Sequence, residues 1–294
     1  MIGPLIAQLA ASGHDVTVAC RLLAVPRSSY YSWQRRAGAP TDSDVADAHL
    51  ANLVFDIHAA SGGSYGSPRV HAELTLGRNL MINRKKTARL LRVVDRQGIC
   101  APRKSRRATP AAAVHEDLVR RRFVAEGPDR IWCTDITEHP TSEGKVYCCA
   151  VLDVWSRMIV GWSIADHVRS ELVVDALEMA RWNRRPGRDT TICHSDRGSQ
   201  YTSWIFGHRL RQAGLLGSMG RVASSVDNTM IESFWSTMQR ELLDRRTWAT
   251  KTELGTAIFE WIEGWYNPHR RHSGIGYLSP ATFEAQHRDA QRAA

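Results

Sequence analysis

The stretch RIWCTDITEHPTSEGKVYCCAVLDVWSRMIVGWSIA, residues 130–165, decides the fold class. It contains three segments rich in β-branched and aromatic residues, at 130–138, 145–156 and 157–165. Such segments are typical of strands, and the polar residues between them are few enough for hairpins. Three antiparallel strands are therefore predicted.

The residues after this stretch alternate between helical and strand patterns. Ser170 can cap a helix whose apolar residues recur at i, i+3, i+4 and i+7. A strand is predicted at 190–196, a helix at 203–214, a short strand at 215–220 and a last helix after Asp227-Asn228. Hairpins followed by such units predict an α/β fold with a mixed five-stranded sheet and flanking helices.

The chain before residue 106 is predicted to be helical. Residues 16–36 contain two short helical patterns separated by Ala24-Val25-Pro26, with Ser28 or Ser29 as the cap of the second. The basic end of this segment favours a helix-turn-helix over a plain helical hairpin, which fits the same pattern. Further helices are predicted at 49–58, 69–76 and 84–98.

Five segments follow from these patterns. They are a helix-turn-helix module at 1–36, a linker at 37–48, a second helical DNA-binding module at 49–105, a basic linker at 106–125 and a catalytic core at 126–290.

The positive charge is concentrated in the helical part. The whole chain has a formal charge of +9, and residues 1–125 contain 19 Lys and Arg against 9 Asp and Glu. Between Arg84 and Arg107 there are ten basic residues and a single acid, Asp95. Such a surface favours DNA phosphates, although a solvated helix face fits the charge run as well.

The helix predicted at 84–98 carries much of this charge. Asn83 can cap it, and Ala88, Leu91 and Val94 are expected to face inward. The basic residues on its outside are the predicted DNA contacts. These are Arg84, Lys85, Lys86, Arg89 and Arg92.

The cysteines and the hydropathy indicate the cellular compartment. The six cysteines have no C-x-x-C spacing and mostly lie in apolar runs, which fits a reducing cytoplasm and implies no structural zinc. The chain has no basic leader segment and no apolar run of 18 residues. A soluble protein that is neither secreted nor bound to a membrane is predicted.

Three carboxylates stand where the predicted sheet could gather them. Asp135 lies inside a short apolar strand, and Asp196 in HSDRGSQY (194–201) ends another. Glu232 flanks the apolar stripe of the last predicted helix, and thirty-five residues separate it from Asp196. Each residue has an ordinary alternative: a buried hydrogen-bond acceptor for Asp135, a turn former for Asp196 and a solvated helix residue for Glu232.

Neighbouring acids repel one another unless a cation lies between them. Mg²⁺ is the hard ion that prefers carboxylate oxygens, water and phosphate oxygens, and Mn²⁺ accepts the same ligands. Two such ions about 3.5–4 Å apart could activate an attacking oxygen and stabilise a leaving oxygen at phosphorus. Two ions held by Asp135, Asp196 and Glu232 are therefore predicted.

Five motifs in order carry a family resemblance. WCTDIT, LDVWSRMIVGW, HSDRGSQY, DNTMIESFW and YNPHRRHSGIGYLSP together resemble the catalytic subunit of a bacterial two-frame insertion-sequence transposase. Such proteins belong to the retroviral-integrase superfamily of Asp-Asp-Glu recombinases. The resemblance extends over nearly the whole chain, because SSYYSW (28–33) and SYGSPRV (64–70) are similar to that family's N-terminal helical modules.

The resemblance implies a ribonuclease H-like catalytic core in which Asp135, Asp196 and Glu232 match the family's metal-binding acids. It implies binding to the terminal inverted repeats of an element and to target DNA, strand cleavage, transfer of the freed 3′-hydroxyl, and action as a homo-oligomer on DNA. A fusion with an upstream-frame DNA-binding partner is open. One departure is visible, because the family has a basic residue where this chain has Gln239, and Arg240 is the adjacent DNA-contact candidate.

Two other functions were weighed. A ribonuclease H-like nuclease would use the same carboxylates, but it has no need of two sequence-reading helical modules. A catalytically silent DNA-binding regulator would keep the basic helices, but it has no reason to keep three carboxylates in register.

Overall fold

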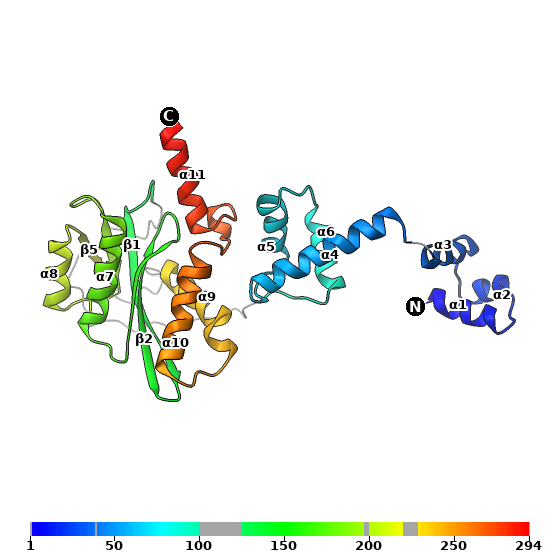
Figure 1. Ribbon diagram of the computed structural model, residues 1–294, viewed down its shortest axis with the longest axis horizontal. Helices are drawn as coiled ribbons and strands as arrows, with labels where there is room; N and C mark the ends of the chain where they lie inside the picture. The colour runs from blue at the N-terminus through cyan, green and yellow to red at the C-terminus, as the bar shows by residue number, and fades with distance from the viewer. Residues whose placement is uncertain (1, 39, 100–124, 197–199, 220–228, 294) are drawn as a thin grey trace. The chain divides into compact units, whose positions relative to one another are not determined.

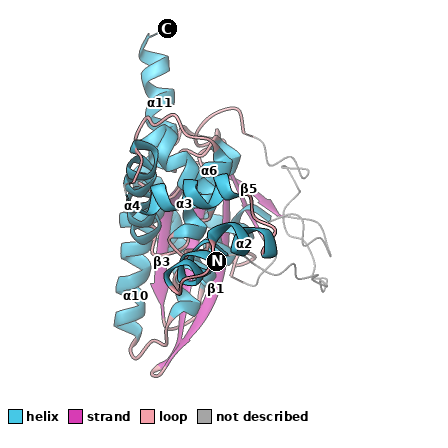
Figure 2. Cartoon of the chain, turned by 90° about the vertical axis from the view of Figure 1, so that its right-hand side faces the viewer, coloured by secondary structure: helices cyan, strands magenta, loops and turns pink. Residues whose placement is uncertain are grey.

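The structure is a computed structural model that describes residues 2–38, 40–99, 125–196, 200–219 and 229–293. It divides into two compact units, Met1–Gly98 and Ile99–Ala294. Nearly all of the predicted basic linker at 106–125 lies outside the described residues, as do positions 197–199 of HSDRGSQY. Within the described ranges, strands occur only in the second unit (Figure 2).

The first unit consists of helices (Figure 1). They are α1 (Ile2–Ala11), α2 (Val16–Leu22), α3 (Arg27–Gly38), α4 (Asp42–Ala60), α5 (Ser67–Ala72), the π-helix η1 (Glu73–Gly77) and α6 (Arg84–Val93). Ile6, Cys20 and Tyr30 form a small buried core among α1, α2 and α3. The sequence patterns predicted α2 and α3 but not α1.

The predicted linker at 37–48 is too long. α3 continues to Gly38, and α4 begins at Asp42 because Thr41 and Asp44 form a reciprocal capping box. The Thr41 hydroxyl accepts from the Asp44 N–H at 3.2 Å, and the Asp44 carboxylate accepts from the Thr41 N–H at 3.0 Å. This cap satisfies N–H groups that the helix itself leaves without partners. The second half of the predicted linker is therefore helical.

Several helix details also differ from the predictions. α3 begins directly after Pro26, whose carbonyl accepts from the backbone of Ser29 and Tyr30, so neither predicted serine caps it. The helix α7 (Ser170–Arg184) has Arg169 rather than Ser170 at its N-cap, and the Arg169 side chain makes no capping hydrogen bond. In α6 the predicted Asn83 cap is confirmed, at 2.7 Å from the Lys85 N–H. Its buried face consists of Thr87, Leu90 and Leu91, so Leu91 is buried as predicted, whereas Ala88 and Val94 are only partly buried.

The second unit is a five-stranded mixed sheet between helices, which confirms the predicted fold class. Its strands are β1 (Ile131–Thr141), β2 (Gly144–Asp153), β3 (Ile159–Ala165), β4 (Ile192–Ser195) and β5 (Leu216–Met219). The order is β3-β2-β1-β4-β5; β1, β2 and β3 are antiparallel neighbours, and β1, β4 and β5 are parallel neighbours.

Helices cover both faces of this sheet (Figure 1). One face carries α7 (Ser170–Arg184) and α8 (Trp204–Gln212), and the other carries α9 (Thr229–Glu241), α10 (Lys251–Phe259) and the π-helix η3 (Glu260–Tyr266). The short helices η2 (Leu243–Arg245) and η4 (Ser273–Ile275) and the terminal α11 (Pro280–Ala293) complete the unit.

Side chains of β1 alternate between the two cores. Ile131 and Cys133 pack in the cluster that includes α9 and α10, whereas Trp132 packs in the cluster that includes α7 and α8. Because strand side chains alternate with a period of two, Asp135 emerges on the α9 face. The fold thus decides which helix meets Asp135.

Candidate active site at the edge of the sheet

Asp135 and Asp196 meet through the pairing of two parallel strands. β1 and β4 pair from Ile131 opposite Ile192 to Thr134 opposite Ser195. The next position in this register places Asp135 beside Asp196, the first residue after β4. Asp196 is exposed, whereas Asp135 is half-buried.

Glu232 comes to the same edge from the helix layer. It lies in the first turn of α9, half-buried beside Ile231, Phe234 and Trp235, which pack on the sheet. The predicted stripe of α9 is buried as expected through Met238. An apolar stripe fixes the rotation of the helix, so its flank holds Glu232 at the rim.

The charges of these three acids interact. Burial raises the pKa of Asp135, the nearby charges of Asp196 and Glu232 add to the rise, and the resulting value is about 7. The backbone N–H of Ile136 and the indole of Trp235 act in the opposite direction on the same pKa. An acid with such a pKa in a group of carboxylates is a candidate functional residue.

The donor chemistry of this edge fits a divalent cation. Carboxylate oxygens are hard ligands, and a cation would relieve the repulsion that raises the pKa of Asp135. As the described side chains stand, they contain no group of three or more His, Cys, Asp and Glu residues arranged to hold a metal ion. The acids at this edge therefore interact electrostatically, but their side chains are not arranged as a complete metal site.

Asp153 has a structural role in the turn after β2. It is fully buried, and its carboxylate accepts from the backbone of Asp129 at 2.7 Å and from the backbone of Ser156 at 2.8 Å. Burial raises its pKa, and these two N–H groups oppose that rise. Its two oxygens therefore join the turn after β2 to the backbone before β1.

The segment YNPHRRH, residues 266–272, makes side-chain hydrogen bonds to β3 and to α9. The side chain of Asn267 bonds to both the N–H and the carbonyl of Ile159 in β3, each at 2.9 Å. Arg270 is buried and donates to both carboxylate oxygens of Glu241 in α9, at 2.7 and 2.8 Å. The sequence of this segment is compatible with a phosphate contact or with an exposed loop. The side chains of Asn267 and Arg270 are instead buried and bonded within the second unit.

The basic residues of α6 fall into two groups. Arg84, Lys85 and Arg92 are exposed. Lys86 and Arg89 instead form ion pairs with Asp47 of α4, which the sequence patterns did not reveal. The predicted phosphate contacts therefore include two side chains that already have an acidic partner.

Gln239 and Arg240 lie near the C-terminal end of α9. Gln239, at the position of the expected basic residue, donates to Asp244 at 2.5 Å, and Arg240 is half-buried beside it.

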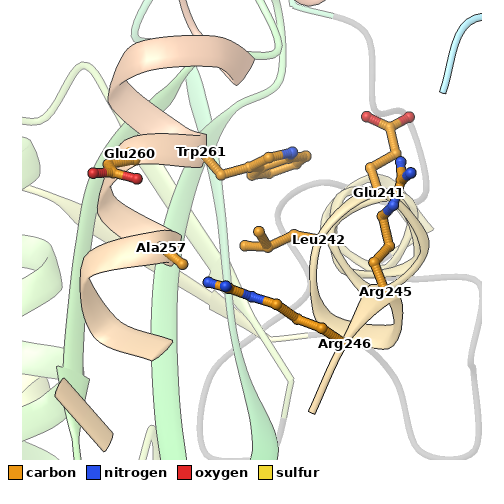
Figure 3. Close-up of a pocket in the computed structure, with 7 residues that line it drawn as sticks. All are labelled: Glu241, Leu242, Arg245, Arg246, Ala257, Glu260 and Trp261. Carbon is orange, nitrogen blue, oxygen red and sulfur yellow. The ribbon is translucent and has the colours of Figure 1, made fainter. Parts of the chain in front are cut away.

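At the far end of α9 lies a separate hollow of about 360 Å³, shown in Figure 3. Trp261 and Arg246 extend into this hollow, which lies more than two helical turns from Glu232.

A mixed sheet in this order, covered by helices on both faces and carrying one acid within β1 and another directly after β4, defines a ribonuclease H-like integrase core. Two models described as integrase core domain match residues 125–225 and 214–280, and one described as HTH-like domain matches residues 45–107. In the part of the chain that the structure describes, no helix is both long enough and apolar enough to span a membrane.

The chain resembles insertion-sequence transposases over most of its length. It is 36% identical over 277 residues to the transposase InsF for insertion sequence IS3A of Escherichia coli K12, covering 92% of this chain and 94% of that relative. It is 34% identical over 269 residues to the transposase of insertion sequence element IS629 of Shigella sonnei, covering 90% of each. The chain belongs to the IS3 family of insertion-sequence transposases.

Solved structures give a more distant match. The catalytic core domain of HTLV-2 integrase in complex with magnesium is 14% identical, with a TM-score of 0.40, and the match covers 54% of this chain and 97% of that one.

Proposed function

We propose that this protein is a DNA transposase that binds the terminal inverted repeats of its element and catalyses strand cleavage and strand transfer. The observation that supports the proposal is the neighbouring position of Asp135 and Asp196 in the register of β1 and β4 of an integrase-type sheet, with Glu232 near enough for its charge to raise the pKa of Asp135. Because the substrate would be DNA, we expect the protein to act in the cytoplasm, as a homo-oligomer on DNA, alone or fused to an upstream-frame partner.

In this proposal the three carboxylates hold one or two Mg²⁺ or Mn²⁺ ions. Divalent ions in such a site supply charge stabilisation for the attacking and leaving oxygens at phosphorus. The parallel pairing of β1 and β4 fixes Asp135 relative to Asp196, and the buried stripe of α9 fixes Glu232. The protein contributes alignment, so no side chain needs to become covalently attached to DNA.

Two phosphoryl transfers follow. In cleavage, a water oxygen forms a bond to phosphorus at the element's end, the bond from phosphorus to the 3′ oxygen breaks, and a 3′-hydroxyl is released. In transfer, that hydroxyl oxygen attacks a target phosphodiester, loses its proton to solvent and displaces the 3′ oxygen of the target strand. The second step replaces one phosphodiester with another, so no nucleotide cofactor is needed.

The helical first unit would supply DNA affinity. The exposed face of α6 carries Arg84, Lys85 and Arg92, which suit phosphate oxygens. The match of residues 45–107 to an HTH-like domain supports the assignment of sequence recognition to this part of the chain. A simple ribonuclease H-like nuclease does not account for such a unit.

The test uses the full chain and duplexes taken from the DNA that flanks its gene. We expect Mg²⁺-dependent nicking at the repeat end, with Asp196→Asn abolishing cleavage while end binding persists. Asp189→Asn, which alters an exposed acid on the loop before β4, is the matched control and should leave both unchanged.

Other outcomes would assign a different function. Cleavage of the RNA strand of a hybrid, without cleavage of the repeat end, would favour the nuclease. Specific end binding without any cleavage by the wild-type chain would favour the silent regulator.

A further inference from the structure

Trp235 lies between the helix and the strand that carry two of the proposed ligands. It follows Glu232 by three residues on α9, so the two side chains project from neighbouring positions of the helix. Only 9% of the residue is exposed, and it packs in the same core as Ile131 and Cys133, the β1 residues on the face of Asp135. The indole is thus buried beside the Asp135 side of the sheet.

The indole nitrogen is notable in this setting. Trp235 Nε1 is shielded from solvent and makes no hydrogen bond of regular geometry to the described residues. A buried N–H without a partner costs free energy that a phenyl ring in the same place would not cost. The neighbouring Phe234 shows that this part of α9 also accommodates a ring without a polar atom.

The indole N–H of Trp235 affects the carboxyl group of Asp135. The Trp235 indole lowers the pKa of Asp135, against the larger effects of burial and of the Asp196 charge. The two groups therefore lie close enough to interact, although they form no hydrogen bond of regular geometry. Hydrogen bonds in active sites are often long or poorly aligned before the site is loaded.

We propose that Trp235 is a positioning residue whose indole N–H donates to the Asp135 carboxylate and holds its other oxygen toward the divalent cation. This inference rests on the proposed function, because it assigns Asp135 as a cation ligand. A carboxylate oriented by a second layer of hydrogen bonds loses less freedom when it binds an ion. Loss of such a partner elsewhere weakens metal affinity by about 10–100-fold.

The test removes the N–H and keeps the ring. In the full chain, Trp235→Phe should weaken Mn²⁺ binding, measured by calorimetry, by about 10-fold or more. The matched control is Trp248→Phe, because Trp248 is buried in the same core and its N–H donates to the Leu243 carbonyl at 3.0 Å. The control should leave Mn²⁺ affinity unchanged, and near-ultraviolet circular dichroism verifies that both variants are folded.

A second measurement follows the N–H itself. In indole ¹H–¹⁵N spectra, the resonance that is absent from Trp235→Phe identifies Trp235 Nε1. We expect this resonance to move downfield when Mg²⁺ is added to the wild-type chain, because the hydrogen bond to Asp135 becomes shorter and straighter. A role in packing alone predicts no such movement.

The outcomes separate the two proposals. Wild-type Mn²⁺ binding that is lost in Asp135→Asn but retained in Trp235→Phe overturns the positioning role and leaves the proposed function standing. Equal weakening in Trp235→Phe and Trp248→Phe also overturns it, because the effect is then one of packing. No Mn²⁺ binding by the wild-type chain, with or without end DNA, overturns the proposed function as well.

Discussion

Arg270 donates two hydrogen bonds to Glu241, and so joins the YNPHRRH segment to the C-terminal turn of α9, the helix that carries Glu232. Both side chains of the pair are almost fully buried. The guanidinium also lies over the ring of Tyr266, 5.8 Å from its centroid. The family segment near the C-terminus therefore acts on the placement of α9.

Breaking this pair should destabilise the second unit. Removing one partner of a buried ion pair leaves a charge without compensation and costs about 3–5 kcal/mol. We expect Arg270→Met to lower the thermal unfolding midpoint of the second unit strongly, and Arg270→Met combined with Glu241→Met to recover much of it. Arg288→Met, at an exposed arginine of α11, is the control. A single variant as stable as the wild type would contradict the role of the pair.

In the wild-type chain, the Asp47 carboxylate should weaken DNA binding by the first unit. Its carboxylate pairs with Lys86 and Arg89, and these partners lower its pKa. In Asp47→Ala both cations become available to phosphates. We expect several-fold tighter DNA binding at low salt and a steeper dependence on salt, by about 0.9 in the log–log slope for each added phosphate contact.

The control for Asp47 is Asp56→Ala, which removes an exposed acid from the same helix. Fluorescence anisotropy across a salt series measures both affinity and slope. If Asp56→Ala has the same effect, net charge rather than release of Lys86 and Arg89 is responsible.

Arg240 should carry the phosphate contact that Gln239 does not provide. Gln239 is engaged with Asp244, whereas Arg240 lies on the exposed half of α9 with Ser236. We expect Arg240→Ala to weaken binding of end DNA about 10-fold, as loss of about 1.4 kcal/mol implies. Adding Gln239→Lys to this variant should restore most of the affinity in gel-shift assays. No loss in Arg240→Ala, or no recovery in the double variant, would show that the DNA follows another face.

The pH dependence of stability without metal should reveal Asp135. Aspartate in an unfolded chain titrates near 3.9, whereas the pKa of Asp135 is about 7 in the folded protein. Between these values the folded state binds more protons than the unfolded state, so this group makes stability fall as the pH rises. Below pH 3.9 the contribution vanishes.

This sign predicts the behaviour of a variant. In the presence of a chelator, Asp135→Asn should raise the unfolding midpoint at pH 8 and change it little at pH 4, as measured by scanning calorimetry. Asp189→Asn should show no such difference between the two pH values. An Asn variant that is less stable than the wild type at pH 8 would show that the ionised carboxylate of Asp135 does not destabilise the folded protein.

The sequence by itself determined the elements of the second unit from β1 to α9 and their kind, whereas α10 (Lys251–Phe259) and α11 (Pro280–Ala293) were not predicted. Segments rich in β-branched and aromatic residues predicted β1, β2 and β3, and the i, i+3, i+4 pattern predicted α7 and α9, because these signals depend on residues close together in the chain. The order of the elements, taken with the motifs, was sufficient for the ribonuclease H-like fold class. Helix ends were less well predicted, since the Thr41–Asp44 cap and the start at Pro26 depend on hydrogen-bond geometry.

Only the tertiary structure decided which side chains meet. The register of β1 against β4 places Asp135 beside Asp196, and the rotation of α9 brings Glu232 and Trp235 to the same face. The partners of Arg270 and Lys86 lie 29 and 39 residues away from them in the chain. Nothing in a local pattern selects such partners, because they are chosen by the packing that buries the apolar faces, and the polar side chains bond to whatever that packing brings near.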